Sequence, residues 1–208
     1  MRGHGNTQKH ETSNPLQRRL IDAFHSQAVA YIRRVAPASI LEVGCGEGYV
    51  LAEIQRVGIA APLVGVDLSE VAIEAARQRV APPAQLVVGD ARDVVTSLSG
   101  PQPDLVLMLE VLEHLDDPEA MLDDLAVLTA RHVLLSVPRE PLFRGMNLLR
   151  VKNVRDLGND PEHVNHWSAR AFVDFVSRRF DVVAVARPFP WTMVLASVRD
   201  GDGAAPRS

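Results

Sequence analysis

The stretch Glu42-Val43-Gly44-Cys45-Gly46-Glu47-Gly48 (EVGCGEG, residues 42–48) follows the apolar run 40–43 and carries three glycines. An apolar run closed by glycines predicts a buried strand that turns into a helix, and glycine lets that turn approach a ligand closely. A nicotinamide fingerprint, G-x-G-x-x-G, would need glycine where Tyr49 stands. The stretch also lacks G-x-x-x-x-G-K, which excludes a nucleoside-triphosphate loop of that kind.

Apolar runs alternate with amphipathic segments on both sides of this turn, which predicts an α/β fold. We expect further strands over 63–66, 85–88, 105–109 and 132–137, and helices over 15–35, 50–57, 69–80, 118–128 and after Ser168. Strands that are apolar on both faces predict a parallel sheet with helices on both faces. Two last runs, 182–186 and 193–198, are joined by too few residues for a parallel crossover, so we expect an antiparallel hairpin at one edge.

Acidic residues close two of these strands. Asp67 ends the second strand, where a carboxylate can accept both hydroxyls of a ribose, and Asp90 ends the third, where it can meet an adenine amine. Each aspartate alone is also explained as a helix cap or turn residue. Together with the glycine turn they favour a nucleoside ligand at the carboxyl edge of the sheet.

Four motifs as a set resemble the class I S-adenosylmethionine-dependent methyltransferases: EVGCGEG at 42–48, GVDLS at 65–69, VVGDA at 87–91 and LEVLEHLDDPEAML at 109–122. The resemblance implies a Rossmann-like, mostly parallel sheet of seven strands in the order 3-2-1-4-5-7-6, with strand seven antiparallel. We expect a single methyltransferase domain over 15–199, between disordered tails at 1–14 and 200–208.

The resemblance also implies which residues bind S-adenosylmethionine. The three glycines pass under the methionine and ribose parts, Asp67 takes the ribose hydroxyls, Asp90 takes the adenine, and Glu110 lines the methyl-donor end. The full set implied is Glu42, Gly44, Gly46, Gly48, Asp67, Leu68, Asp90, Ala91 and Glu110. Cys45 has no nearby activating group and is interpreted as a small loop filler.

Glu110, Glu113 and His114 have the spacing i, i+3, i+4, which puts them on one face if the turn after the fourth strand is helical. With His163 and His166 they make a mixed oxygen and nitrogen set that suits Mg²⁺ or Mn²⁺. The same E-x-x-E-H arrangement resembles two metal-dependent branches, the ubiquinone-pathway O-methyltransferases and the small-RNA 3′-end 2′-O-methyltransferases. A metal-free catalytic role for His114 with Glu110, or plain packing, remains open.

The connection 138–167 is long for a compact domain, and it resembles the variable substrate cap of this family. Its segment 139–155 is basic and amphipathic, and three interpretations stay open. Arg144 and Arg150 bind an anionic acceptor, the segment contacts an anionic membrane surface that carries a lipid-linked acceptor, or it is the solvated face of a lid helix. Trp167 either walls the substrate pocket or packs in the core.

Composition limits the function further. A net charge of −4 disfavours DNA and general nucleic-acid binding, and a single cysteine indicates a reducing compartment, here the cytoplasm. We therefore predict O-methylation of a small-molecule acceptor by a monomer or homodimer, with Mg²⁺ or Mn²⁺ as an optional cofactor. The alternatives are an RNA 3′-end 2′-O-methyltransferase and a non-catalytic S-adenosylmethionine-binding module.

Overall fold

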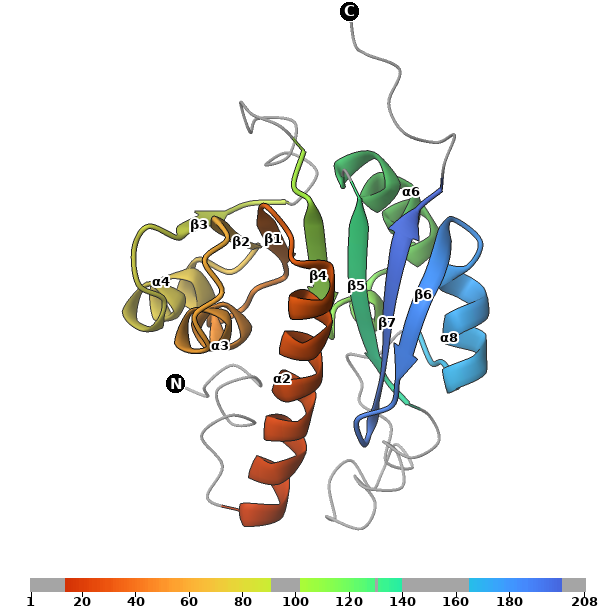
Figure 1. Cartoon of the computed structure of the whole chain (residues 1–208), viewed down its shortest axis with the longest axis horizontal. Helices are drawn as coiled ribbons and strands as arrows, with labels where there is room; N and C mark the ends of the chain where they lie inside the picture. Colours follow the sequence, from red (N-terminus) through yellow and green to blue (C-terminus); the bar gives the residue numbers. More distant parts are fainter. Residues whose placement is uncertain (1–13, 91–101, 130, 140–164, 200–208) are drawn as a thin grey trace, which may run out of the picture.

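The computed structural model describes residues 14–90, 102–129, 131–139 and 165–199. Seven strands form one sheet in the order β3-β2-β1-β4-β5-β7-β6 (Figure 1), which confirms the predicted order. The strands are β1 (Ile40–Val43), β2 (Leu63–Asp67), β3 (Gln85–Val88), β4 (Leu105–Leu109), β5 (His132–Pro138), β6 (Phe180–Ala186) and β7 (Trp191–Val198). The helices are α2 (Pro15–Val35), α3 (Tyr49–Arg56), α4 (Glu70–Arg79), the 3₁₀ helix η1 (Leu112–His114), α6 (Pro118–Leu128) and α8 (Ala169–Val176).

The first five strands pair in parallel, and β7 runs antiparallel to both β5 and β6. The predicted edge hairpin is therefore confirmed. Both of its strands begin two residues earlier than predicted, at Phe180 and Trp191. Polar Asp181 and Thr192 interrupt the apolar runs there, although both residues pair within the sheet.

Helices cover both faces of the sheet, as the apolar strands predict. Neighbouring residues of a strand point to opposite faces, and β4 shows the result. Val106 and Met108 belong to one core with α6 and α8, whereas Leu105 and Leu107 belong to a second core with α2, α3 and α4. All four side chains are fully buried. Two cores, one on each face, thus hold the strand ends in place.

Three helices begin directly after a residue whose side chain caps them. The side chains of Ser69, Asp117 and Ser168 accept the backbone N–H three residues further on, at the starts of α4, α6 and α8. Pro118 occupies the first position of α6, where its missing N–H costs nothing. Each cap contributes about 1 kcal/mol.

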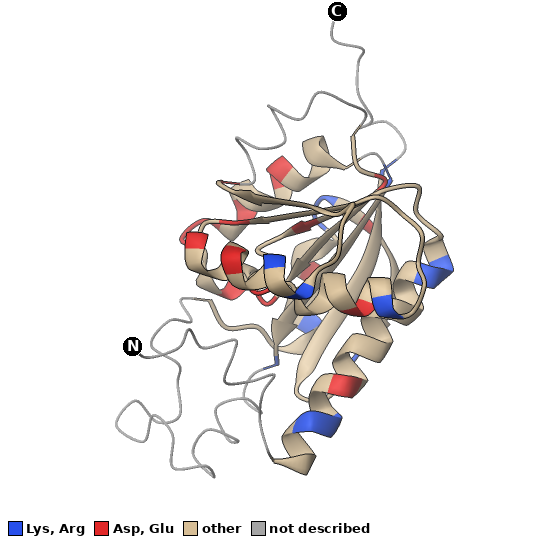
Figure 2. Cartoon of the chain, turned by 90° about the vertical axis from the view of Figure 1, so that its left-hand side faces the viewer, with Lys and Arg blue, Asp and Glu red and all other residues tan. Residues whose placement is uncertain are grey.

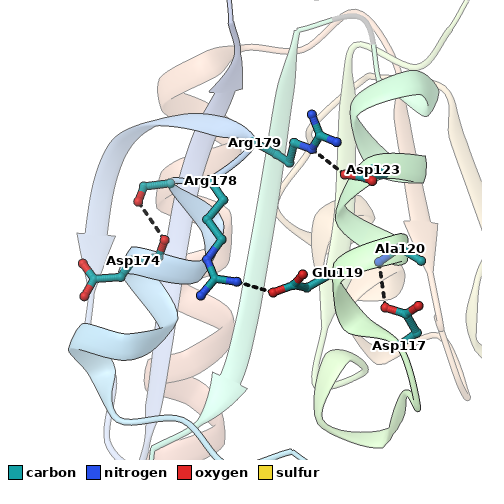
Figure 3. Close-up of polar contacts among 8 residues, drawn as sticks. Asp117, Glu119, Ala120, Asp123, Asp174, Arg178 and Arg179 are labelled. Carbon is teal, nitrogen blue, oxygen red and sulfur yellow. Dashed lines mark hydrogen bonds and ion pairs between the residues drawn. The ribbon is translucent and has the colours of Figure 1, made fainter.

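Two ion pairs connect α8 and the residues just after it with α6 (Figure 3). Arg178 pairs with Glu119, and Arg179 pairs with Asp123. All four side chains are about half exposed or more, so each pair is expected to contribute about 1 kcal/mol or less. The burial of Phe172 in the apolar core that it shares with α6 stabilises the packing of the two helices more than these ion pairs do.

Several predicted features lie outside the described residues. They are the tails, the cap segment 140–164 with Arg144, Arg150 and His163, and Ala91. Arg139 and Trp167, on either side of that segment, form an isolated parallel bridge. Within the described ranges, no helix has the length and apolar character that crossing a membrane requires.

Candidate functional site

The glycine turn lies at the point where the strand order reverses, between β1 and β4. Gly44, Gly46 and Gly48 all have positive φ, at 70°, 53° and 75°. A Cβ added to Gly44 would lie 2.4 Å from Cγ2 of Val111, just beyond β4. The turn therefore approaches the neighbouring strand end closely, at the position where open parallel sheets bind their ligands.

Asp67 connects the ends of three strands. Its Oδ2 accepts the backbone N–H of Gly46 at 2.8 Å, and its Oδ1 accepts that of Ser69 at 2.9 Å. Its backbone carbonyl accepts the N–H of Gly89, after β3, at 3.0 Å. Because two backbone donors fix the carboxylate, its orientation is set before any ligand arrives, and a carboxylate has further lone pairs for two hydroxyls.

Glu42 lies beneath the turn and is only 3% exposed. Burial, and then the charge of Asp67, raise the pKa of Glu42 to about 8. Among the described residues its Oε2 has no hydrogen-bond partner, which is uncommon for a buried polar atom.

Cys45 is buried in the same turn, and its Sγ lies 3.8 Å from the carbonyl oxygen of Gly46. Burial raises the pKa of the Cys45 thiol well above its usual range, and the nearby Glu42 and Asp67 carboxyls raise it further. A thiol that stays protonated is a poor nucleophile. The environment of Cys45 fits its interpretation as a loop filler.

Leu68, predicted to bind the cofactor, and Asp90, predicted to bind its adenine, follow the carboxyl ends of β2 and β3. Leu68, directly after Asp67, is 75% exposed, and Asp90 is also exposed. An apolar side chain presented to solvent beside a fixed carboxylate can cover the face of a flat base, while an aspartate can accept from its amine.

Glu110 follows β4 with φ at 61°, a left-handed conformation that is rare outside glycine. Its Oε1 accepts the hydroxyl of Ser136 on β5 at 3.4 Å, and its Oε2 accepts the indole N–H of Trp191 on β7. Sequence reasoning missed Trp191. No local pattern marks it, because the contact depends on β7 lying beside β5.

The described candidates for metal ligands do not form a metal-binding group. The helical turn η1 begins at Leu112, so Glu110 lies outside it and the three residues do not share one helical face. Glu113 is only 1% exposed, whereas His114 and His166 are exposed. Across the described residues, no group of three His, Cys, Asp or Glu side chains is arranged to hold a metal ion. These residues do not fit a Mg²⁺ or Mn²⁺ site.

The residues on both sides of the cap segment have distinct environments. The ring of Trp167 lies 5.8 Å from that of Phe172 and 5.4 Å from that of Phe175, so it packs on α8 as a core residue would. Among the described residues the buried Nε of Arg139 has no hydrogen-bond partner, although its backbone N–H donates to Pro190. A guanidinium N–H can donate to an anion.

The surface charge agrees with the modest net charge of −4. Figure 2 shows acidic and basic residues interspersed along the helices on the side that faces the viewer. This side therefore offers no continuous basic stripe of the kind that tracks a nucleic-acid backbone.

Comparison with known proteins agrees with this geometry. Residues 15–183 match the family described as a methyltransferase domain. No curated protein matches the sequence. The fold resembles that of magnesium protoporphyrin IX methyltransferase from Synechocystis PCC 6803 with bound S-adenosylhomocysteine, with a TM-score of 0.67, 20% identity, and 95% of this chain and 90% of that chain covered.

Two further solved structures are similar. The methyltransferase domain of bacterial CtHen1 has a TM-score of 0.62 and 23% identity, with 86% of this chain and 100% of that chain covered. N-methyltransferase NodS from Bradyrhizobium japonicum WM9 has a TM-score of 0.66 and 16% identity, with 95% of this chain and 94% of that chain covered. At these identities the likeness establishes the fold. With the family match over 15–183, it follows that the chain belongs to the methyltransferase domain family and has the class I S-adenosylmethionine-dependent methyltransferase fold.

Proposed function

We propose that this protein transfers the methyl group of S-adenosylmethionine to a hydroxyl of a small-molecule acceptor. The observation that carries the proposal is the Asp67 carboxylate, fixed by the N–H groups of Gly46 and Ser69 at the reversal point of the sheet. When bound, the cofactor supplies a sulfonium-activated methyl group for in-line displacement. The protein has to orient the acceptor oxygen, exclude water and receive a proton.

The residues around Asp67 fit this cofactor. The Asp67 carboxylate accepts the ribose hydroxyls, and exposed Leu68 covers one face of the adenine with Asp90 beside it. Glu42 keeps a buried oxygen without a partner, and its pKa of about 8 leaves it mostly protonated at neutral pH. It can therefore both donate to and accept from the polar groups of the methionine part.

The acceptor hydroxyl is placed at the end of β4, beside Glu110. In this proposal Glu110 orients the hydroxyl, and exposed His114 receives its proton as a general base. No step uses a metal ion, since the described donors are not arranged around one. NodS is named as an N-methyltransferase, so amines are the competing acceptor class.

An acceptor with a negative charge is favoured over a neutral one. Arg139 supports this, because its buried Nε has no partner and a guanidinium pairs well with carboxylate or phosphate. Arg144 and Arg150 are expected to add further positive charge that attracts the anionic acceptor. Magnesium protoporphyrin IX, which names one neighbour, is a small molecule rather than a nucleic acid.

The test has two stages. Calorimetry with S-adenosylhomocysteine should give saturable binding at one site, and the absence of binding would refute the cofactor assignment. Release of S-adenosylhomocysteine is then followed across matched panels of hydroxylated and aminated metabolites, with an RNA 3′ end included. Turnover only with amines or only with RNA would contradict the hydroxyl acceptor, and cofactor binding without turnover would favour a binding module.

A further inference from the structure

We propose that Trp191 and Ser136 are positioning residues that hold Glu110 in place to orient the acceptor hydroxyl. The inference rests on the proposed function and deepens it. Three adjacent strands each contribute one residue, with Glu110 after β4, Ser136 on β5 and Trp191 at the start of β7. Neither Trp191 nor Ser136 belongs to a motif that marks the cofactor site.

The backbone at Glu110 is strained, which indicates that the surroundings impose its conformation. A φ of 61° brings the Cβ of a non-glycine residue close to the following carbonyl. Such a conformation persists where neighbouring contacts over-determine it, and these places cluster at functional sites. Here the Glu110 N–H donates to the carbonyl of Ser136 at 3.2 Å, and the two side-chain donors hold the carboxylate.

Trp191 is itself held firmly, so it can fix another group. Its ring centroid lies 4.9 Å from that of Phe24 on α2, at an interplanar angle of 57°. It pairs with Pro138 in the sheet, and its backbone N–H donates to Pro188 at 2.6 Å. The indole N–H is a donor only, so its partner must be an acceptor such as a carboxylate.

The arrangement gives Glu110 a defined task. Ser136 donates to Oε1 and Trp191 donates to Oε2, so both oxygens of the carboxylate are oriented, and a carboxylate accepts roughly four hydrogen bonds in all. The two protein donors thus fix the carboxylate that orients the acceptor hydroxyl.

The first experiment uses Trp191→Phe, which keeps an aromatic ring against Phe24 and removes the N–H. With the acceptor found by the metabolite panel, kcat should fall about 10- to 100-fold, because small misplacements of catalytic groups have effects of that size. The dissociation constant for S-adenosylhomocysteine should change less than about twofold, since this product lacks the methyl group and the Asp67 contacts proposed to bind it do not involve Trp191. Trp191→His, which restores a ring N–H, should recover part of the rate.

Three outcomes would overturn the inference. In the first, kcat of Trp191→Phe stays within twofold of the wild type. In the second, kcat and cofactor affinity fall together, which indicates general damage. In the third, Glu110→Gln and Trp191→Phe have additive effects, because residues acting as a unit are non-additive. Ser136→Ala should show the same pattern as Trp191→Phe with a smaller amplitude.

A second experiment needs no acceptor. The chain has two tryptophans, so the indole N–H resonance of Trp191 is assigned by its loss in Trp191→Phe. In Glu110→Ala that resonance should move upfield and exchange faster with solvent, whereas an unchanged resonance would refute the link. This result stands even if the wild type proves inactive, so failure of the inference and failure of the proposed function are distinguishable.

Discussion

The backbone N–H of Gly46 donates a 2.8 Å hydrogen bond to Oδ2 of Asp67. The bond joins the turn after β1 to the end of β2, two segments that are 21 residues apart in sequence. It makes the carboxylate part of the turn rather than an independent side chain. The geometry of the glycine turn and the orientation of Asp67 therefore depend on each other.

Replacing Asp67 with alanine should weaken cofactor binding. The change removes the proposed partner of the ribose hydroxyls and the anchor of the Gly46 and Ser69 N–H groups. Hydrogen bonds to charged groups contribute about 1.5–3 kcal/mol, so the dissociation constant for S-adenosylhomocysteine should rise at least about 10- to 100-fold in calorimetry. The dissociation constant of Asp67→Asn, which keeps the shape and one acceptor, should lie between those of the wild type and the alanine variant. Wild-type affinity in the alanine variant would contradict the assignment.

Gly44→Ala should destabilise the protein strongly, and Gly58 offers a matched control. Both glycines have φ near 70°, but a Cβ at Gly44 would meet Val111 at 2.4 Å, while nothing lies within 4 Å of one at Gly58. Gly58→Ala should cost only backbone strain, about 1–2 kcal/mol. Gly44→Ala should cost more because the clash is added. Urea unfolding measures both, and equal losses would show that the close approach to Val111 is unimportant.

Glu42 should make stability fall as pH rises. Its pKa is raised from 4.5 to about 8 in the folded protein, so the folded state binds more protons than the unfolded state between these values. The contribution of Glu42 to the free energy of unfolding is fully present below pH 4.5 and is lost as pH rises to 8. The slope is at most about 1.4 kcal/mol per pH unit.

Glu42→Gln removes this titration, and the difference between the two proteins isolates it. His25 and His132 also titrate, with pKa values lowered by burial, but their contributions cancel in that difference. Urea unfolding between pH 5 and 8 should therefore show the glutamine variant gaining relative stability as pH rises. A constant difference across the range would refute the raised pKa.

Arg139→Gln should weaken binding of an anionic acceptor. Loss of a charge-assisted hydrogen bond should raise KM for that acceptor about 10-fold or more, while kcat stays within about twofold. Arg139→Lys keeps the charge without the planar fork and should be intermediate. A neutral analogue of the acceptor should show no change between wild type and variant; an equal rise for both would indicate a packing role.

Chelation should leave activity intact. Among the described residues, Glu113 is buried, His114 is exposed and Glu110 accepts from Trp191, and no three of the predicted donors form a metal-binding group. We expect turnover after EDTA treatment to stay within about twofold of the untreated rate, because a metal that acidified the hydroxyl would be essential. Loss of turnover that Mg²⁺ or Mn²⁺ restores would contradict this.

Much of the fold could be predicted because its signals are local. Apolar runs define the strands, and Ser69, Asp117 and Ser168 mark the helix starts at which caps form. The short connection between the last two strands required an antiparallel hairpin, and the structure contains it. The E-x-x-E-H spacing places its residues on one face only if a helix begins at Glu110, whereas the backbone there is left-handed and the helical turn begins at Leu112.

The sequence by itself determined the order of elements and the residues that end each strand, Asp67 and the glycine turn among them. Only the tertiary structure decided that Trp191 bonds to Glu110, 81 residues away, and that Arg139 lies beside Pro190. The reason is physical. Periodicity records which side of a strand is buried, but partners across the sheet depend on where β7 inserts, and no neighbouring residue in the chain carries that information.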